Sequence, residues 1–292
     1  MPAFRALVVT EVPYGRDLFP DFPRTRPARV EGSTFRSREG FVSRGRSRSR
    51  SRGRWLPDQH GAWAMLAVPF LAGTLLGSPR WAHLPLLAAW LLGYMATYHA
   101  QQWLRLSRLS RNPKAPRRHI RPALVFGAAF AVLGLPLAYR YPWLLAACLV
   151  AVPFVAANTW YARRNKERAL VNGLLAVVPA CGMLLVTYRL GEGSWGALGP
   201  ALACLLYFAG TVPYVKTMIR ERNSRTYYRG SVTYHALAIP AAALLSPWLA
   251  LPFAAYLVRA LVLPGRGVKV PVVGAIEVMG SVALLVTLLL AF

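Results

Sequence analysis

Acidic residues are scarce in this chain of 292 residues, which has ten Asp and Glu against 35 Lys and Arg and a net charge of +25. Half of the acids lie in the first 54 residues. The other five stand far apart in the sequence: Asp58, Glu167, Glu192, Glu221 and Glu277. Paired magnesium sites draw several carboxylates from short, acid-rich stretches. Two such metal clusters therefore cannot be built here in the usual way.

Cysteine is also rare, and its three positions are Cys148, Cys181 and Cys204. All three fall within apolar runs, and no CxxC pair occurs. Zinc sites and disulfide frameworks need closely spaced or even-numbered cysteines, so the sequence indicates neither. We expect the three thiols to be buried as small hydrophobic groups, and we assign no metal and no cofactor.

Long apolar runs, by contrast, recur from Gly61 to Phe292, in a chain that is 55% hydrophobic with a mean hydropathy of +0.37. These runs are continuous, whereas membrane β-strands alternate apolar and polar residues over about ten positions. The sequence therefore predicts an all-α, polytopic transmembrane helical bundle of about nine spans. The predicted spans cover roughly residues 60–77, 82–102, 122–138, 143–161, 169–187, 195–215, 231–246, 248–263 and 271–291.

The first 54 residues differ in composition from the rest of the chain. They hold thirteen of the 35 Lys and Arg and end in "RGRSRSRSRGR". Low apolar content with many Arg, Ser and Pro residues is typical of disorder. We expect a disordered tail over residues 1–54 and a transmembrane domain over 55–292. An Arg/Ser run can bind anionic lipid or nucleic acid, but we expect a solvated leader without a specific nucleic-acid partner.

Basic residues alternate between the predicted loops. Nineteen lie in or beside the loops after the second, fourth, sixth and eighth spans, and the other loops hold only Arg80, Arg140 and Arg189. Loops rich in Lys and Arg stay in the cytoplasm. The sequence therefore predicts an N-terminus inside and a C-terminus outside.

Polar residues gather at the predicted cytoplasmic ends of the spans. Singly, each has a structural explanation, such as helix capping by Asp58 or interfacial anchoring by a tyrosine. Together they favour a polar cavity that opens to the cytoplasm. The candidate ligand-binding residues are Asp58, Gln59, His60, His99, Asn158, Asn172, Tyr214, Lys216, Arg220, His235 and Glu277.

The stretch "YVKTMIRERNSRTYYRG" is the richest in charge. Lys216 and Arg220 are four residues apart, so they share one face of a helix. Two cations at the end of a bundle suit the phosphate or carboxylate of a lipid headgroup, which Arg can bind bidentately. The alternative is that they only set the topology and contact anionic lipid nonspecifically.

Three motifs, "PDQHGAWAM", "RRNKERALVN" and "YVKTMIRERNSRTY", resemble the YwiC-like family of bacterial integral membrane proteins. The resemblance covers about Trp55 to Phe292 and implies a multi-pass protein of the bacterial cytoplasmic membrane. It supplies no catalytic residues, and none is assigned here.

A looser similarity connects the chain to the UbiA-type intramembrane prenyltransferases, which have nine helices and cytoplasmic loops after spans two and six. That family holds Mg²⁺ with two Asp-rich motifs. The corresponding stretches here read "TYHAQQWLRL" and "YVKTMIRERN", in which Glu221 is the only carboxylate.

Four functions remain open from the sequence. We prefer a protein whose cytoplasmic cavity binds an anionic lipid-like ligand, with membrane lipids and an isoprenoid or quinone-like molecule as candidate partners. The alternatives are a prenyltransferase-type enzyme in which Lys216 and Arg220 replace the metal, and a small-solute transporter that uses the intramembrane Arg259 and Glu277. A haem or metal protein would use His60, His99 and His235. The oligomeric state is left open.

Overall fold

The computed structural model describes Trp55 and residues 60–292, of which residues 60 and 61 by their backbone only. The predicted disordered tail, Asp58 and Gln59 lie outside the described residues. The described part forms nine α-helices, one short 3-10 helix and no β-strand, so the predicted all-α fold is confirmed. Its elements are α1 (His60–Leu76), α2 (His83–Leu109), α3 (Lys114–Arg140), α4 (Trp143–Arg163), α5 (Leu170–Glu192), α6 (Leu198–Ile219), α7 (Arg225–Leu245), η1 (Pro247–Leu249), α8 (Ala250–Val262) and α9 (Val270–Ala291).

Three helices run further than their apolar segments. α2 continues to Leu109, α3 begins at Lys114, and α7 begins at Arg225. These extensions are rich in Arg and Lys, which favour helix nearly as well as Leu does. The apolar pattern therefore located the helices but not the polar turns that project from the bundle.

Five helices of the described part, α3, α4, α5, α6 and α9, are long and apolar enough to cross a membrane, and α1 and α8 are apolar but shorter. Large apolar side chains are exposed along α3 and α4, among them Leu124, Leu135, Leu149 and Val150. Apolar faces of this extent suit a hydrocarbon surrounding, as in a multi-pass membrane protein. The number of nine spans and the orientation of the termini stay predictions.

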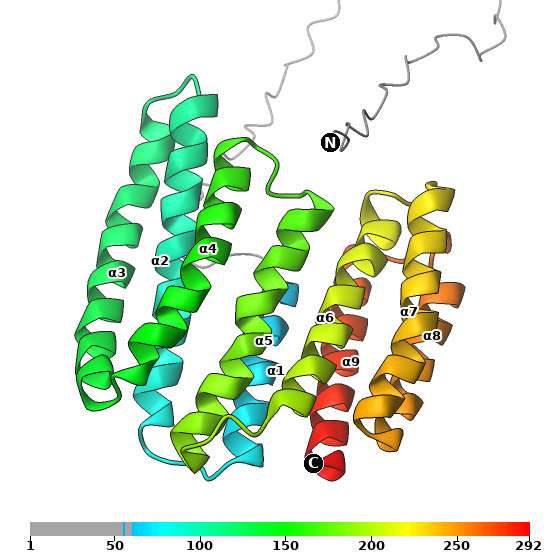
Figure 1. Ribbon diagram of the computed structural model, residues 1–292. Helices are drawn as coiled ribbons and strands as arrows, with labels where there is room; N and C mark the ends of the chain where they lie inside the picture. The colour runs from blue at the N-terminus through cyan, green and yellow to red at the C-terminus, as the bar shows by residue number, and fades with distance from the viewer. Residues whose placement is uncertain (1–54, 56–59) are drawn as a thin grey trace, which may run out of the picture. The chain divides into compact units, whose positions relative to one another are not determined.

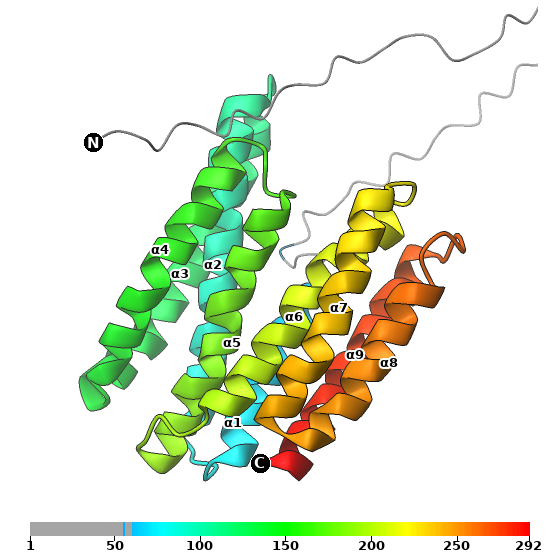
Figure 2. The same ribbon diagram turned by 45° about the vertical axis from the view of Figure 1, so that its right-hand side comes forward.

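The helices pack in an order that differs from their order in the chain. α2 and α3 form a closely packed hairpin, and α6 to α9 lie together (Figures 1 and 2). α1 packs mainly against α5 and α9 and only slightly against α2, the next helix in sequence. The first helix thus lies between α5 and α9.

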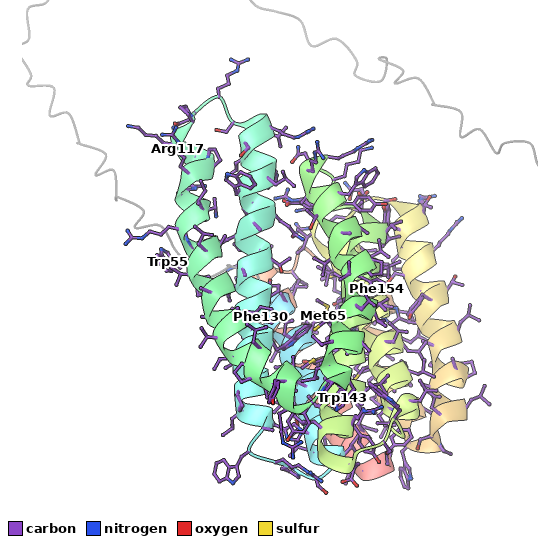
Figure 3. All side chains as sticks on the ribbon, turned by 60° about the vertical axis from the view of Figure 1, so that its left-hand side comes forward. Trp55, Met65, Arg117, Phe130, Trp143 and Phe154 are labelled. Carbon is purple, nitrogen blue, oxygen red and sulfur yellow. The ribbon has the colours of Figure 1, made fainter. Side chains whose placement is uncertain are left out.

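Successive helices run in opposite directions, so that the connections after α2, α4, α6 and α8 lie at one end, the upper end in Figure 1. We call this the basic end, because most of the nineteen Lys and Arg lie in these connections or in the adjoining ends of the helices, whereas Arg259 lies inside α8. The other end, called the opposite end, carries the remaining connections and the C-terminus. Figure 3 shows Arg117 near the basic end of α3 and Trp143 near the opposite end of α4.

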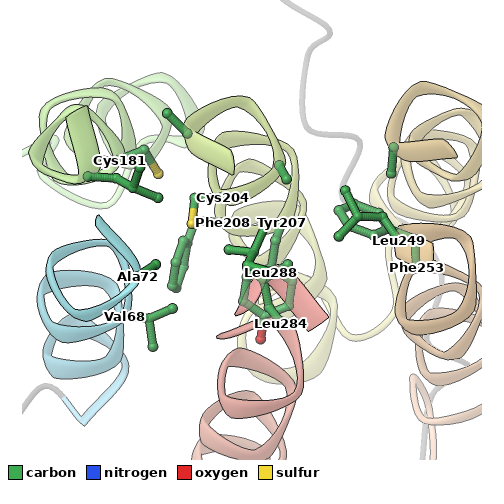
Figure 4. Close-up of a cluster of buried hydrophobic side chains, with 14 of the residues drawn as sticks. Val68, Ala72, Cys181, Cys204, Tyr207, Phe208, Leu249, Phe253, Leu284 and Leu288 are labelled. Atoms are coloured by element: carbon green, nitrogen blue, oxygen red, sulfur yellow. The ribbon is translucent and has the colours of Figure 1, made fainter. Parts of the chain in front are cut away.

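The largest hydrophobic cluster joins α1 and α5 to α6, α7, α8 and α9 (Figure 4). Cys181 and Cys204 are buried in it, as expected for small hydrophobic residues, whereas Cys148 is exposed on α4. A close approach of α1 to α5 depends on Gly73, where a Cβ atom would collide with the carbonyl oxygen of Leu184 and with Oγ1 of Thr187. Small residues at such contacts let membrane helices pack closely.

Candidate functional site

The predicted site residues fall into separate groups. Asp58 and Gln59 are not among the described residues, and His60 begins α1 with its side chain undescribed. His99 lies in the α2–α3 hairpin. Four others lie near the basic end of α4, α5 and α6, namely Asn158, Asn172, Lys216 and Arg220. The last three lie on α6, α7 and α9, namely Tyr214, His235 and Glu277. The structure therefore brings some of the predicted residues together and leaves others apart.

His99 belongs to a chain of hydrogen bonds between α2 and α3. Its Nε2 donates to the carbonyl oxygen of Trp55 at 2.9 Å, so its Nδ1 accepts from Nδ1 of His119, also at 2.9 Å. Nε of Arg118 donates in turn to Nε2 of His119 at 3.3 Å. Phe126 stacks on the His99 ring. These bonds account for both nitrogens of each ring.

Three cations lie at the basic end, and we call Arg168, Lys216 and Arg220 the basic rim. Nζ of Lys216 donates to the main-chain oxygen of Arg168 at 2.7 Å, which ties α6 to the α4–α5 connection. Arg220 ends α6 as its C-cap residue. Burial and the positive charge of Arg168 lower the pKa of Arg220, and Glu167 opposes this. The guanidinium of Arg220 therefore stands close to a like charge.

The carboxylate of Glu167, beside the basic rim, is held by a fourth cation. Nη1 of Arg105 on α2 contacts Oε1 of Glu167 at 2.7 Å, and Nε of Arg105 donates to Oδ1 of Asn165 at 2.9 Å. Asn165 has a φ of 56°, a left-handed conformation that Asn tolerates better than most residues. The predicted Asn172 donates from Nδ2 to the main-chain oxygen of Glu167 at 2.7 Å. The negative charge of Glu167 is thus already paired with Arg105.

Asn158 and Asn172 each keep one buried polar atom without a partner. In both residues it is the side-chain oxygen Oδ1, for which the described residues offer no donor. Buried amide oxygens are usually satisfied by protein or water. Both residues lie on the helices that flank the α4–α5 connection, close to the basic rim.

A second polar cluster is buried between α6, α7, α8 and α9, and we call it the inner polar cluster. Its members are Tyr207, Tyr214, Ser231, His235, Tyr256, Arg259 and Glu277. Three of them, Tyr214, His235 and Glu277, were predicted as site residues from the sequence. The structure places these three around Arg259.

Arg259 is the centre of the inner polar cluster. Its Nη1 is bonded to Oε1 of Glu277, and its guanidinium carbon lies 4.5 Å from the ring centroid of Tyr214, 5.1 Å from that of Tyr256 and 5.5 Å from that of Tyr207. A cation among aromatic faces is stabilised by their quadrupoles, and the more so when it is desolvated. The three tyrosines thus hold the guanidinium in place.

Two of these tyrosines are fixed to α9 by hydrogen bonds. The hydroxyl of Tyr207 donates to the main-chain oxygen of Glu277 at 3.0 Å, and the hydroxyl of Tyr256 donates to that of Gly280 at 2.7 Å. A Cβ atom at Gly280 would lie 2.7 Å from the Tyr207 hydroxyl and 3.3 Å from Nη1 of Arg259. Gly280 therefore leaves the space that the tyrosine and the guanidinium occupy.

The sequence missed Tyr207 and Tyr256, and it named Arg259 with Glu277 only under the transporter alternative and not among the candidate ligand-binding residues. Two signals were present in the spacing. Tyr207 and Tyr214 are seven residues apart and so share a face of α6, and Tyr256 precedes Arg259 by three residues on α8. Helix periodicity can thus group these residues in pairs, but it does not show which helices face one another.

Comparison with known proteins agrees with the motifs. The model of the YwiC-like protein family matches residues 56–188. A protein of Haemophilus influenzae is 32% identical over 244 residues, which cover 81% of this chain and 98% of that protein. YwiC of Bacillus subtilis is 31% identical over 230 residues, which cover 77% of this chain and 93% of that protein. No solved structure matches the chain.

The chain belongs to the YwiC-like family. The resemblance inferred from the three motifs is therefore confirmed. The match to the YwiC-like family model ends within α5, so it includes α1 to α4 but neither the inner polar cluster nor Lys216 and Arg220.

The histidines of this YwiC-like protein are not gathered at one place. His99 lies between α2 and α3, and Nδ1 of His235 donates to the main-chain oxygen of Ser231 on α7 at 2.7 Å. Within the range that the structure describes, no three His, Cys, Asp or Glu side chains are arranged to hold a metal ion. Of the three histidines named for a haem or metal site, His99 and His235 thus lie on different helices with different partners, and the side chain of His60 is not described.

An apolar cleft of about 580 Å³ lies between α2, α3, α4 and α5. Phe130 of α3 and Phe154 of α4, both labelled in Figure 3, are among its lining residues, and so are Trp90 and Trp195. It occupies the half of these helices nearer the opposite end, away from the basic rim. A hydrocarbon chain is the kind of group that such a lining suits.

Proposed function

We propose that this YwiC-like protein resides in the bacterial cytoplasmic membrane and binds the anionic headgroup of a membrane lipid at the basic rim. The bundle supports a membrane location, because five of its described helices are long and apolar enough to cross a membrane and large apolar side chains are exposed on them. Because the connections at the basic end hold most of the Lys and Arg, that end faces the cytoplasm. The headgroup therefore comes from the cytoplasmic leaflet.

The observation that carries this proposal is the bond between Lys216 and the main-chain oxygen of Arg168. It joins α6, which also carries Arg220 at its end, to the α4–α5 connection that contains Arg168. The ion pair between Arg105 and Glu167 neutralises the adjacent carboxylate. An anionic phosphate relieves the repulsion among the three cations, and Arg220 can bind two of its oxygens at once.

Native mass spectrometry tests the proposal. The full chain is reconstituted in nanodiscs that contain equal amounts of phosphatidylglycerol and phosphatidylcholine, and the lipids retained after release are identified. Each cation near a membrane surface contributes about 1 kcal/mol of attraction, so removing two weakens anionic-lipid retention by tenfold or more. We expect this loss in the Lys216→Ala/Arg220→Ala variant.

The matched control is Arg80→Ala/Arg140→Ala, which removes two exposed cations at the opposite end. We expect the control to keep the preference of the wild type for phosphatidylglycerol. Equal retention by the wild type and the Lys216→Ala/Arg220→Ala variant, with both folded, would refute the proposal.

A further inference from the structure

The guanidinium of Arg259 uses only one side for Glu277. Nη1 makes that bond, whereas Nε and Nη2 are buried and have no hydrogen-bond partner in the part of the chain that the structure describes. The residue is only 8% exposed. Nε and Nη2 together form one edge of the guanidinium, with parallel donors. An entire hydrogen-bonding edge of a buried cation, here called the open edge, therefore has no partner among the described residues.

A third unused donor belongs to Tyr214, whose ring lies against the same guanidinium. Its hydroxyl is buried with no acceptor among the described residues, and the side chain is fully buried. The Tyr207 and Tyr256 hydroxyls, by contrast, both donate to α9. Buried donors are nearly always satisfied, because leaving them unpaired is costly. The inner polar cluster thus keeps three buried donors, two on Arg259 and one on Tyr214, without an acceptor among the described residues.

We propose that the open edge of Arg259 and the hydroxyl of Tyr214 bind a carboxylate or phosphate group. Parallel N–H donors match two oxygens of one anionic group, which is the geometry that Arg uses for carboxylates and phosphates. The tyrosine hydroxyl adds a third donor from another helix. This site is distinct from the basic rim and does not depend on it.

The depth of the site fits a group that enters from the basic end. Arg259 precedes the last residue of α8, Val262, by three positions, which at 1.5 Å per residue is about one helical turn below the end of the helix. Tyr214 precedes the last residue of α6, Ile219, by five positions. Both a lipid headgroup and a small soluble anion can supply the group, and the two sources are separated by experiment.

The negative charge of Glu277 disfavours binding of the anion, although the same side chain orients Arg259. Its carboxylate shares the same guanidinium, so an anion on the open edge is repelled by a nearby negative charge. Glu277→Gln keeps the shape and an oxygen acceptor for Nη1 but removes that charge. We expect this variant to bind the anion more tightly than the wild type.

The experiment uses two probes, inorganic phosphate and a short-chain phosphatidic acid, with the full chain in mild detergent. Calorimetric titration measures the dissociation constant, and the thermal unfolding midpoint reports the linked stabilisation. Arg259→Lys keeps the positive charge beside Glu277 but lacks the paired donors. We expect this variant to weaken binding by about tenfold or more, since a charge-assisted bond is lost.

Tyr214→Phe removes a single hydroxyl and tests the site even where Arg259→Lys does not fold. Arg266→Ala is the control, because it removes an exposed cation from the α8–α9 connection at the same end. Binding of phosphatidic acid alone, weakened in both variants, supports the site with a lipid source, and binding of both probes supports it with a small-anion source. No binding of either probe by the wild type, or equal binding by the wild type and both variants, would overturn the proposal.

Discussion

Arg259 of α8 and Glu277 of α9 form a buried ion pair in which the arginine keeps one edge of its guanidinium unused. Charged side chains inside a membrane bundle are costly and usually face a partner within it. Here Glu277 accepts a hydrogen bond from Nη1 of Arg259, and Nε and Nη2 have no partner among the described residues. The same pair therefore joins two helices and provides a candidate binding group.

Removing one partner of this pair should destabilise the bundle strongly. Glu277→Ala leaves Arg259 buried without a counter-charge, and losses of about 3–5 kcal/mol are typical of such variants. The double variant Arg259→Met/Glu277→Met should recover a large part of the loss, because it buries no charge. Reversible unfolding in mixed micelles measures the free energy of unfolding. A Glu277→Ala variant as stable as the wild type would show that the pair contributes nothing to the fold.

The contact between α1 and α5 should be sensitive to one added methyl group. Gly73→Ala forces a Cβ atom against the Leu184 carbonyl and Thr187, and overpacking of this kind costs about 1–3 kcal/mol. Gly127→Ala is the matched control on α3, where the structure places no atom within 4 Å of the new Cβ. We expect the control to be neutral or slightly stabilising, because Ala favours helix over Gly. Similar unfolding midpoints for both variants would contradict the close approach.

Neutralising Glu167 should strengthen lipid binding at the basic rim. Glu167→Gln frees Arg105 and removes the negative charge near Arg220, so the net positive charge of this region rises by one. At about 1 kcal/mol per charge, retention of phosphatidylglycerol should increase roughly fivefold. Glu192→Gln, at the end of α5 away from the rim, is the control. Lower retention in Glu167→Gln than in this control would argue against the electrostatic account.

Chemical labelling can determine which end of the bundle faces the cytoplasm. In a Cys148→Ala background, single cysteines are introduced as Ser194→Cys at the opposite end and Arg266→Cys at the basic end. A membrane-impermeant maleimide added to intact cells should label the first variant and not the second, because basic loops remain in the cytoplasm. After cell lysis both should react. Labelling of Arg266→Cys but not of Ser194→Cys in intact cells would show the opposite orientation.

Much of the helical layout was predictable from the sequence. Long apolar runs located the nine described helices, since continuous hydrophobicity over such lengths leaves few alternatives in a membrane. Their polar extensions were missed where Arg and Lys continue the helix, as from Arg225 at the start of α7. Hydropathy identifies segments that bury apolar surface, and these terminal helical turns bury little of it.

The candidate site was predictable only in part. Placement of Tyr214, His235 and Glu277 near one end followed from topology, but their meeting at Arg259 depends on α6, α7, α8 and α9 packing together. Packing of non-consecutive helices cannot be read from the periodicity of one sequence. The position of His99, apart from this cluster, could not be predicted for the same reason. Its partner His119 is brought to it by the packing of α2 against α3.

Photo-crosslinking tests most directly where the lipid binds. A phosphatidylglycerol with a photoreactive group on its headgroup is incorporated into nanodiscs with the wild-type chain, and the crosslinked peptides are identified by mass spectrometry. The account predicts crosslinks concentrated in residues 163–170 and 216–225, which fall in number when Lys216 and Arg220 are replaced by Ala. Crosslinks spread evenly over both ends of the bundle, or unchanged in that variant, would contradict a headgroup site at the basic rim.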